Sequence, residues 1–186
     1  MALLSHREVT TMELLRLTER NHPLFDAAFG LYEEAFPYLE RRDAKEHCRV
    51  LQKDDYHMDV LMDADLFAGI VFYWETERFL FLEHLATCPE LRGNGLGAQA
   101  LELLKVKGKP IILEIEPPAD GLTHRRLGFY ERNGFVLNPY RHIQAKYHPG
   151  DEDLELKTLS YPRILTQDEY DGFYTYMIRE VSLCGA

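Results

Sequence analysis

"PELRGNGLGAQALELL", residues 89–104, sets Gly93, Gly95 and Gly97 in front of a run with the apolar spacing of a helix. An ordered glycine loses more conformational entropy than any other residue, so a group of them needs a reason. The amino end of a helix has free N–H groups and the positive end of the helix dipole, which together attract an anion. Glycines let those N–H groups approach phosphate oxygens without obstruction by Cβ. The stretch therefore predicts a phosphate-binding turn at the start of a helix.

Three other interpretations of this stretch differ in what they require of the sequence. Gly93-x-Gly95-x-x-Ala98 satisfies the dinucleotide fingerprint G-x-G-x-x-G/A, and an acid, Glu114, follows about 20 residues later. That fingerprint should close the first strand of repeated βαβ units, whereas antiparallel strands are predicted before it here. The sequence has no G-x-x-x-x-G-K-[ST], which excludes a nucleoside triphosphate loop. A turn that only starts a helix does not require so many glycines beside Arg92.

Composition limits the class of protein. The chain has 186 residues, of which 46% are hydrophobic and 28% charged, as is typical of one soluble globular domain. A net charge of −10 disfavours nucleic acid and favours a cationic partner. An odd number of cysteines without C-x-x-C spacing disfavours disulfides and a thiolate metal site. The opening "MALLSHREVT" is too short and too charged for a signal peptide, and no run approaches the roughly 20 apolar residues of a membrane span. We expect a cytoplasmic protein without membrane contact.

Hydrophobic spacing predicts the order of elements. Short polar connections between the strands of 56–88 indicate antiparallel hairpins. Thr166 and Glu169 form a capping box that starts the last helix. We expect a single α/β (α+β) domain over 1–186, with a core at about 12–160, an appended helix at about 166–184, and a mixed, mostly antiparallel central sheet flanked by helices. The predicted elements are strand 12–19, helix 23–36, helix 40–53, strands 56–65, 66–75 and 79–88, helix 96–107, strand 109–116, helix 123–134, the strand pair 135–147 and 154–165, and helix 166–184.

Three motifs carry a family resemblance. Arg92, Gly95 and Gly97 satisfy R-x-x-G-x-G/A, "RRLGFYERNGF" follows at 125–135, and "EAFPYLER" at 34–41 is a weaker third motif. Together they resemble the GNAT superfamily of acetyl-CoA-dependent N-acetyltransferases over roughly residues 12 to 160. The resemblance implies the GNAT-like acyl-CoA N-acyltransferase fold, with acetyl-CoA as co-substrate and no metal. The predicted order of elements agrees with that fold.

The resemblance also implies where coenzyme A binds. The backbone from Arg92 through Ala98 would contact the pyrophosphate, and the pantetheine arm would lie along strand 79–88. In this family the parallel strands splay apart there, which leaves backbone groups free for the pantetheine amides. Either of two arginines on the helix that follows would reach the nucleotide phosphates. The implied coenzyme-binding residues are Leu85, Ala86, Thr87, Arg92, Gly93, Asn94, Gly95, Leu96, Gly97, Ala98, Arg125 and Arg126.

Direct transfer, in which the amine attacks the thioester, is the reaction that the resemblance implies. Tyr130 occupies the family's usual position for the proton donor to the departing thiolate; the alternative is an aromatic that packs on the sheet. Glu114 resembles a strand glutamate that serves as general base in some members, and Glu83 is its rival; the alternative for either is a buried glutamate satisfied by backbone donors. On a regular strand Glu83 and His84 point to opposite faces, so we do not expect them to act as a pair. Three further histidines lack the spacing of a metal motif and are expected at the surface or in the core: His57, His142 and His148.

The acceptor is expected between the segment 34–43 and the loop 141–153. An aliphatic amine arrives as a cation, since its pKa is near about 10, and acidic residues in both segments would attract it. We therefore expect a cationic primary amine, of a small molecule or a protein, rather than an anionic amino sugar phosphate or nucleic acid. The acids named for this role in and beside these segments are Glu33, Glu34, Glu40, Asp151, Glu152 and Asp153, with Phe36, Tyr38, Tyr140 and Tyr147 as candidate walls.

Two other functions remain open at this point. The first is a regulatory or structural acyl-CoA-binding domain without transferase activity, which would bind the coenzyme but release none of it in the presence of amines. The second is a Rossmann-type oxidoreductase, which requires NAD(H) binding. The sequence does not distinguish a monomer from a homodimer, and it does not identify the acceptor or exclude an acyl group other than acetyl.

Overall fold

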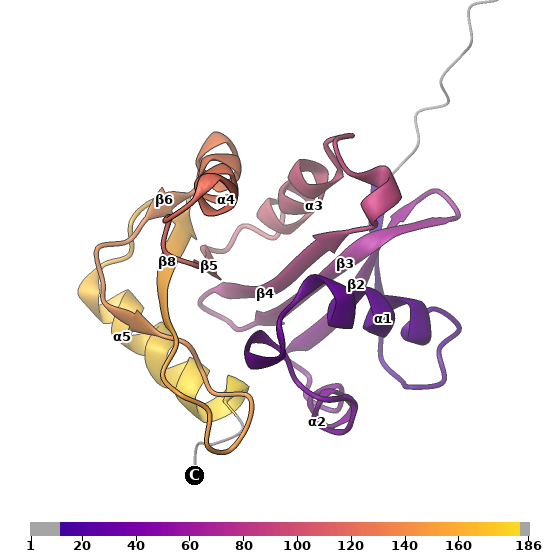
Figure 1. Ribbon diagram of the computed structural model, residues 1–186, viewed down its shortest axis with the longest axis horizontal. Helices are drawn as coiled ribbons and strands as arrows, with labels where there is room; N and C mark the ends of the chain where they lie inside the picture. Colours follow the sequence, from indigo (N-terminus) through magenta and orange to yellow (C-terminus); the bar gives the residue numbers. More distant parts are fainter. Residues whose placement is uncertain (1–11, 183–186) are drawn as a thin grey trace, which may run out of the picture.

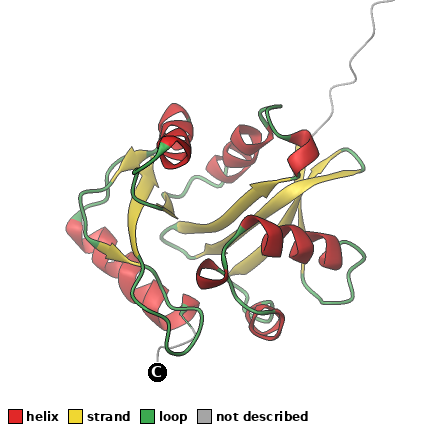
Figure 2. Cartoon of the chain, in the orientation of Figure 1, coloured by secondary structure: helices red, strands yellow, loops and turns green. Residues whose placement is uncertain are grey.

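The computed structural model describes residues 12–182 of the chain. Its centre is an eight-stranded sheet in the order β1-β2-β3-β4-β5-β8-β6, with β7 paired to β8 (Figures 1 and 2). Among the strands of residues 12–182, only β4 and β5 run parallel, and the other six pairings are antiparallel. The strands are β1 (Met12–Leu17), β2 (Tyr56–Asp63), β3 (Leu66–Glu75), β4 (Leu80–Thr87), β5 (Ile111–Ile115), β6 (Val136–Leu137), β7 (His142–Ile143) and β8 (Glu155–Tyr161). The predicted mixed, mostly antiparallel sheet is confirmed.

Helices cover both faces of the sheet, because each helix presents an apolar stripe at the spacing of its turn. One face carries α1, α2 and α5, and the other carries α3 and α4, so that two separate apolar cores form. The helical segments are α1 (Phe25–Ala35), η1 (Tyr38–Glu40), α2 (Ala44–Val50), η2 (Pro89–Leu91), α3 (Leu96–Lys105), α4 (Gly121–Arg132), α5 (Gln167–Tyr176) and η3 (Met177–Val181).

Strand β4 contains a bulge at Glu83. The pairing with β3 passes from Phe72 opposite His84 to Tyr73 opposite Leu82, which leaves Glu83 as an extra residue. A bulge breaks the alternation of side chains along a strand. Glu83 Oε2 therefore lies 3.8 Å from His84 Nδ1 on the same face of the sheet. The expectation that these two side chains point to opposite faces is wrong, since it assumed a regular strand.

Strands β4 and β5 diverge after three residue pairs. Their pairing runs only from Leu80 opposite Ile111 to Leu82 opposite Leu113. Beyond that point the edge of β4 facing β5 has no strand partner, as the resemblance predicted. Figure 1 shows α3 and α4 at the same end of the sheet, over the place where the two strands diverge. The amino ends of both helices follow the carboxyl ends of these strands, so the divergence positions the candidate site.

Three predicted elements differ from the observed ones. The strand predicted at 135–147 is only β6 and β7, because Asn138 still donates its N–H to the carbonyl of Thr158 in β8, but Pro139, which follows it, has no N–H for the ladder. The helix predicted at 40–53 is replaced by the short turn η1 and by α2, which begins where Asp43 caps the N–H of Glu46. The capping box of Thr166 and Glu169 is present, and α5 continues as the π-helical turn η3. The predicted end of that helix and residues 1–11 lie outside the described residues.

Candidate active site

The glycine turn before α3 has the backbone shape that requires glycine. Gly93 has φ +85° and Gly95 φ +78°, in the left-handed region where a side chain is strained. Gly95 is also the N-cap of α3 and provides no capping side chain. A Cβ on Gly97 would lie 3.2 Å from the ring of Phe129, so this glycine permits α3 and α4 to pack closely. The first-turn N–H groups of α3 are thus available to an anion.

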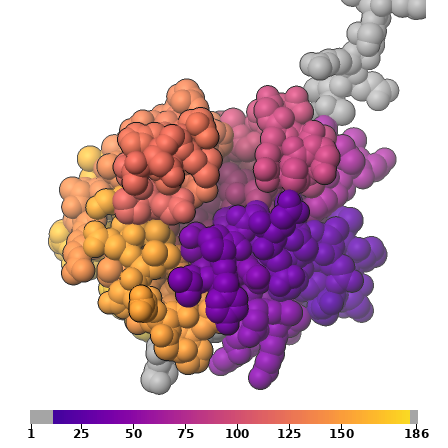
Figure 3. Space-filling model, in the orientation of Figure 1, coloured from indigo at the N-terminus to yellow at the C-terminus, as the bar shows by residue number. Residues whose placement is uncertain are grey.

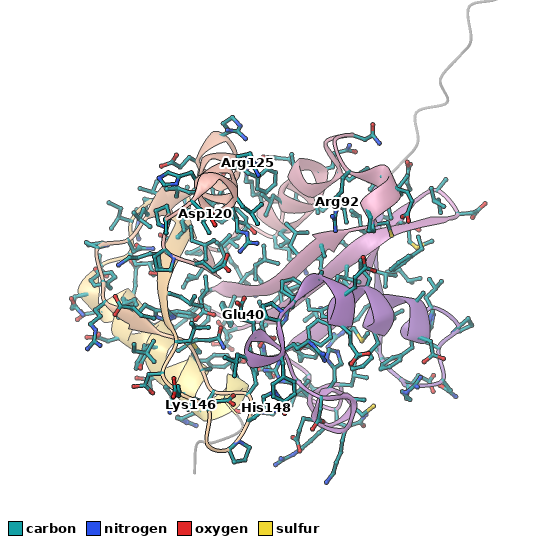
Figure 4. All side chains as sticks on the ribbon, in the orientation of Figure 1. Glu40, Arg92, Asp120, Arg125, Lys146 and His148 are labelled. Carbon is teal, nitrogen blue, oxygen red and sulfur yellow. The ribbon has the colours of Figure 1, made fainter. Side chains whose placement is uncertain are left out.

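A cavity of about 630 Å³ lies between α3 and α4. Figure 3 shows the surface hollowed between these helices, and Figure 4 places Arg92 and Arg125 on facing sides of the opening. Asn94 is the one predicted loop residue that does not line either cavity; its side chain donates to the carbonyl of Leu91 at 3.1 Å. The lining includes the predicted coenzyme residues Leu85, Thr87, Arg92, Gly93, Gly95, Leu96, Gly97, Ala98, Arg125 and Arg126, with Arg132 in addition.

A second cavity, of about 730 Å³, follows the divergence of β4 and β5. This cavity is lined by Ala86 and its neighbours on β4, by residues of β5, and by residues of the segment from α1 to η1. The two cavities form one continuous cleft, because they share the lining residues Leu85, Thr87, Arg92, Leu122, Arg126 and Tyr130.

Tyr130 lies at the junction of the two cavities. Its hydroxyl has no hydrogen-bond partner among residues 12–182. Burial raises the pKa of Tyr130 to about 12, against a smaller lowering by the Arg126 guanidinium. The phenol is therefore protonated at neutral pH and free to donate a proton to a group in the cleft.

Glu83 is held by three side chains on the far side of its strand. Its carboxylate lies 2.8 Å from the Arg42 guanidinium and accepts hydrogen bonds from Tyr147 at 2.6 Å and Trp74 at 2.9 Å. The side chain is only 1% exposed, although the residue as a whole is half-buried, so its exposed part is backbone. Burial alone would raise the pKa of Glu83, but Arg42, with His84 and the hydrogen bonds, holds it below its usual range.

Glu114 contacts a histidine that is fully buried. Its Oε1 lies against Nε2 of His142, whose Nδ1 lies 3.0 Å from the hydroxyl of Tyr170. That hydroxyl donates its one proton to the carbonyl of Arg141, so Nδ1 must donate to it. Glu114 is therefore in contact with a buried ring that Tyr170 also holds.

Three side chains hold the turn η1 by its successive carbonyls. His148 Nε2 lies 3.1 Å from the carbonyl of Tyr38, Gln144 donates to that of Leu39 at 2.8 Å, and His84 Nε2 lies 2.8 Å from that of Glu40. Burial lowers the pKa of His84 to about 4, so its ring is neutral and Nε2 carries the proton it donates. The ring of Tyr38 stacks on His148 at 3.9 Å.

The sequence of residues 18–135 matches the sequence pattern of the Acetyltransferase (GNAT) family. The chain belongs to the GNAT acetyltransferase family. The predicted family is confirmed, and the chain is a member of a family of transferases. The dinucleotide interpretation of the glycine turn is excluded by the same match and by the sheet order.

Individual GNAT proteins are similar to this chain as well. YjbC of Bacillus subtilis (strain 168), named an acetyltransferase, is 37% identical over 107 residues, which cover 55% of this chain and 53% of that protein. The match thus spans about half of this relative's length. A GNAT-family structure from Bacteroides thetaiotaomicron has a TM-score of 0.82 and 28% identity, and covers 92% of this chain and 97% of its own. A GNAT structure from Elizabethkingia anophelis with acetyl-CoA bound has a TM-score of 0.52 at 13% identity, covers 81% of this chain and 95% of its own, and shows likeness of fold alone.

The acceptor segments of this GNAT chain only partly line the cleft. Glu34, Glu40, Phe36 and Tyr147 line the larger cavity, as predicted. The acids of the 141–153 loop do not: Asp151 accepts the N–H of His148, and Asp153 pairs with Lys146. Glu33 pairs with Arg41 on the surface, and Tyr140 stacks on Tyr170. The remaining residues named for this role, Glu152 and Tyr38, are also absent from the lining.

Sequence reasoning missed several residues of the site. Gln144 and Glu116 line the larger cavity, and Arg42 and His142 hold its glutamates. None lies in a recognised motif, and each depends on a contact between distant segments. Within the described residues no three His, Cys, Asp or Glu side chains gather in a way that could hold a metal. Every helix of residues 12–182 is too short or too polar to cross a bilayer.

Proposed function

We propose that this protein transfers the acetyl group of acetyl-CoA to a primary amine by direct attack on the thioester. The observation that carries the proposal is the continuous cleft. One end has an uncapped helix N-terminus and arginines, the other has carboxylates, and Tyr130 lies between them. Such a cleft suits a phosphorylated coenzyme and a cationic acceptor that meet at a proton donor.

The coenzyme end of the cleft is argued from charge and backbone. The first turn of α3 and the side chains of Arg92, Arg125 and Arg126 would bind the phosphates, as helix termini and guanidinium groups do. The unpaired edge of β4 from Glu83 to Thr87 would bind the pantetheine amides. Acetyl-CoA bound to the Elizabethkingia anophelis GNAT structure supports this choice of coenzyme.

The chemistry requires three proton transfers. The acceptor ammonium loses one proton, its nitrogen forms a bond to the acetyl carbon as the bond from that carbon to sulfur breaks, and the nitrogen loses a second proton when it becomes an amide. Tyr130 donates a proton to the departing thiolate, because its raised pKa keeps the phenol protonated until that moment. Holding both reactants in one cleft supplies a large part of the rate.

The experiment measures release of the coenzyme A thiol from acetyl-CoA in the presence of one amine at a time. The panel consists of spermidine, Nα-acetyl-lysinamide, kanamycin, a tetrapeptide with a free N-terminus, and glucosamine 6-phosphate. We expect release above the hydrolysis rate with at least one cationic amine. Binding of acetyl-CoA without release for any amine would favour an acyl-CoA-binding regulatory domain, and absence of binding would refute both.

A further inference from the structure

The carboxylates that line the larger cavity differ in what they contact. Glu83 is occupied by Arg42, Tyr147 and Trp74. Oε1 of Glu114 is in contact with Nε2 of the buried His142. Neither carboxylate is free to take a further proton without disturbing a buried network.

The carboxylate directly after β5 is also paired: Glu116 forms an ion pair with Arg126. Two lining carboxylates remain, Glu34 and Glu40, and neither forms a hydrogen bond or ion pair with any residue of 12–182. Glu34 is exposed on α1, whereas Glu40 is half-buried at the end of η1. Among the acids that line the cavity, Glu40 is therefore the half-buried one whose carboxylate has no hydrogen bond or ion pair with residues 12–182.

The backbone that carries Glu40 is fixed from three directions. The carbonyls of Tyr38, Leu39 and Glu40 accept hydrogen bonds from β4, from the segment after β7, and from the loop before β8. Figure 4 shows Glu40 near the centre of the molecule, with Arg92 and Arg125 beyond it toward the opening of the cleft. A short turn held at each of its residues fixes the backbone of Glu40 relative to the cavity, and a fixed backbone limits the positions that its carboxylate can reach.

We propose that Glu40 binds the ammonium group of the acceptor and takes its proton, as the general base of the transfer. The proposal rests on the proposed function. An N–H bond of the ammonium breaks and an O–H bond forms on Glu40. The neutral nitrogen then attacks the acetyl carbon, the thiolate leaves, and Tyr130 protonates it. The nitrogen gives its surplus proton to the Tyr130 phenolate as it becomes an amide, and Glu40 afterwards releases its proton to water, so that no other reactant is consumed.

The electrostatic surroundings of Glu40 suit this role. Burial raises the pKa of Glu40, Glu116 and Glu114 raise it further, and Arg126 lowers it. His84, the other titratable side chain in contact, is neutral and bonds only to the Glu40 carbonyl. A carboxylate with a raised pKa is a stronger base, and it still ionises when a cation lies beside it.

The test compares Glu40→Gln with wild type in the thiol-release assay, with the panel amine that reacts fastest. Glutamine keeps the size of the side chain, and the three anchoring bonds use backbone carbonyls, so the fold and the stabilisation by acetyl-CoA should be unchanged. We expect kcat/KM to fall by about 10²–10⁴, the usual contribution of a general base. The acidic limb of the pH profile of kcat/KM should disappear, whereas Glu40→Asp should keep a limb at a lower rate.

Glu34→Gln is the matched control, because it removes the same charge from the rim of the same cavity. It should raise KM for a cationic amine and retain the acidic limb. If Glu40→Gln keeps both the wild-type rate and the limb, Glu40 is not the base. If instead Glu114→Gln or Glu83→Gln removes the limb, that glutamate takes its place. If the wild-type protein releases no thiol with any panel amine, the proposed function itself fails.

Discussion

The Glu83 carboxylate lies 2.8 Å from the Arg42 guanidinium, and the two side chains are 1% and 0% exposed. The pair joins the bulge of β4 to the segment between η1 and α2. Arg42 also donates to the carbonyl of Val181 at the end of η3, at 2.9 Å. Three segments that are distant in sequence therefore depend on one buried ion pair behind the cleft.

Breaking this pair should destabilise the fold strongly. Arg42→Met leaves the Glu83 charge buried without its partner, and such a change costs about 3–5 kcal/mol of the free energy of unfolding. The double variant Arg42→Met with Glu83→Gln removes both charges and leaves an oxygen for Trp74 and Tyr147. It should be more stable than Arg42→Met alone in urea denaturation. Equal stability of the two variants would mean that the lost packing, and not the charge, matters.

Acetyl-CoA should raise the melting temperature of the protein by binding the folded state, and Gly95→Val should abolish that shift. Gly95 has φ +78°, which a β-branched residue cannot adopt without moving the turn. Gly108 is the matched control, since it has φ +71° and nothing within 4 Å of an added Cβ, but lies after α3 and away from the cleft. Gly108→Val should lose similar stability and keep the ligand shift. A normal shift for Gly95→Val would refute the phosphate assignment.

The sequence predicted the glycine turn and the sheet because both depend on local signals. Glycines that permit a left-handed backbone stand directly before an apolar helical run, and short polar connections separate the apolar strands. Each of these signals lies within a few residues of sequence. Tyr130 was named through a motif with fixed spacing to the turn. These features lie at the end of the cleft where we propose that coenzyme A binds.

The acceptor end could not be predicted in the same way. The bulge at Glu83 reverses the side-chain alternation, and nothing in "FLFLEHLATC" indicates where the extra residue lies. The pairing of Glu114 with His142 joins residues 28 positions apart through tertiary packing. Glu40 is distinguished from the other half-buried carboxylates of the cavity because those are paired with other side chains. That pairing depends on the folded cleft and is not written in the local sequence.

Tyr130→Phe should lower turnover by roughly a factor of a hundred to ten thousand when chemistry limits the rate. Binding of acetyl-CoA should be retained, because the ring still lines the cleft. Tyr140→Phe is a suitable control, since its hydroxyl donates to the carbonyl of Leu165 and the residue lines neither cavity of the cleft. That variant should lose about 1 kcal/mol of stability and keep its rate. An unchanged rate for Tyr130→Phe would leave this tyrosine with a packing role only.

Stability should fall as the pH drops from about 6.5 toward 4, partly through His84. Burial lowers the pKa of folded His84 from 6.5 to about 4, so the folded state resists its protonation. The contribution of His84 to the free energy of unfolding is therefore complete above the pKa that His84 has in the unfolded state. Below that pKa the contribution decreases, by up to about 3 kcal/mol for such a shift. Asp59 acts in the opposite sense, since burial raises its pKa to about 6 and its contribution is lost as the pH rises.

His84→Gln isolates the contribution of this histidine. Its unfolding free energy at pH 7 should be lower than that of wild type, and it should decline less between pH 6.5 and 4. His124→Gln, at an exposed position on α4, should keep the wild-type slope. Parallel urea titrations at several pH values measure both slopes. A wild-type slope in His84→Gln would show that other groups carry the dependence.

The acceptor should be a cation whose capture depends on salt. The carboxylates of Glu34 and Glu40 line the larger cavity without a counterion from residues 12–182, and the whole chain carries −10. Opposite charges raise the local concentration of a substrate, and salt screens them over about 8–10 Å.

We expect kcat/KM for spermidine or Nα-acetyl-lysinamide to fall as sodium chloride rises from 0.02 to about 0.5 M. At low salt, the anionic amine glucosamine 6-phosphate should react more slowly than the cationic amines. Glu34→Lys should weaken the salt dependence for the cationic amines by reversing one charge at the rim while leaving the acidic limb in place. The proposal of a cationic acceptor would be refuted if the anionic amine reacted faster, or if kcat/KM for the cationic amines did not change with salt concentration.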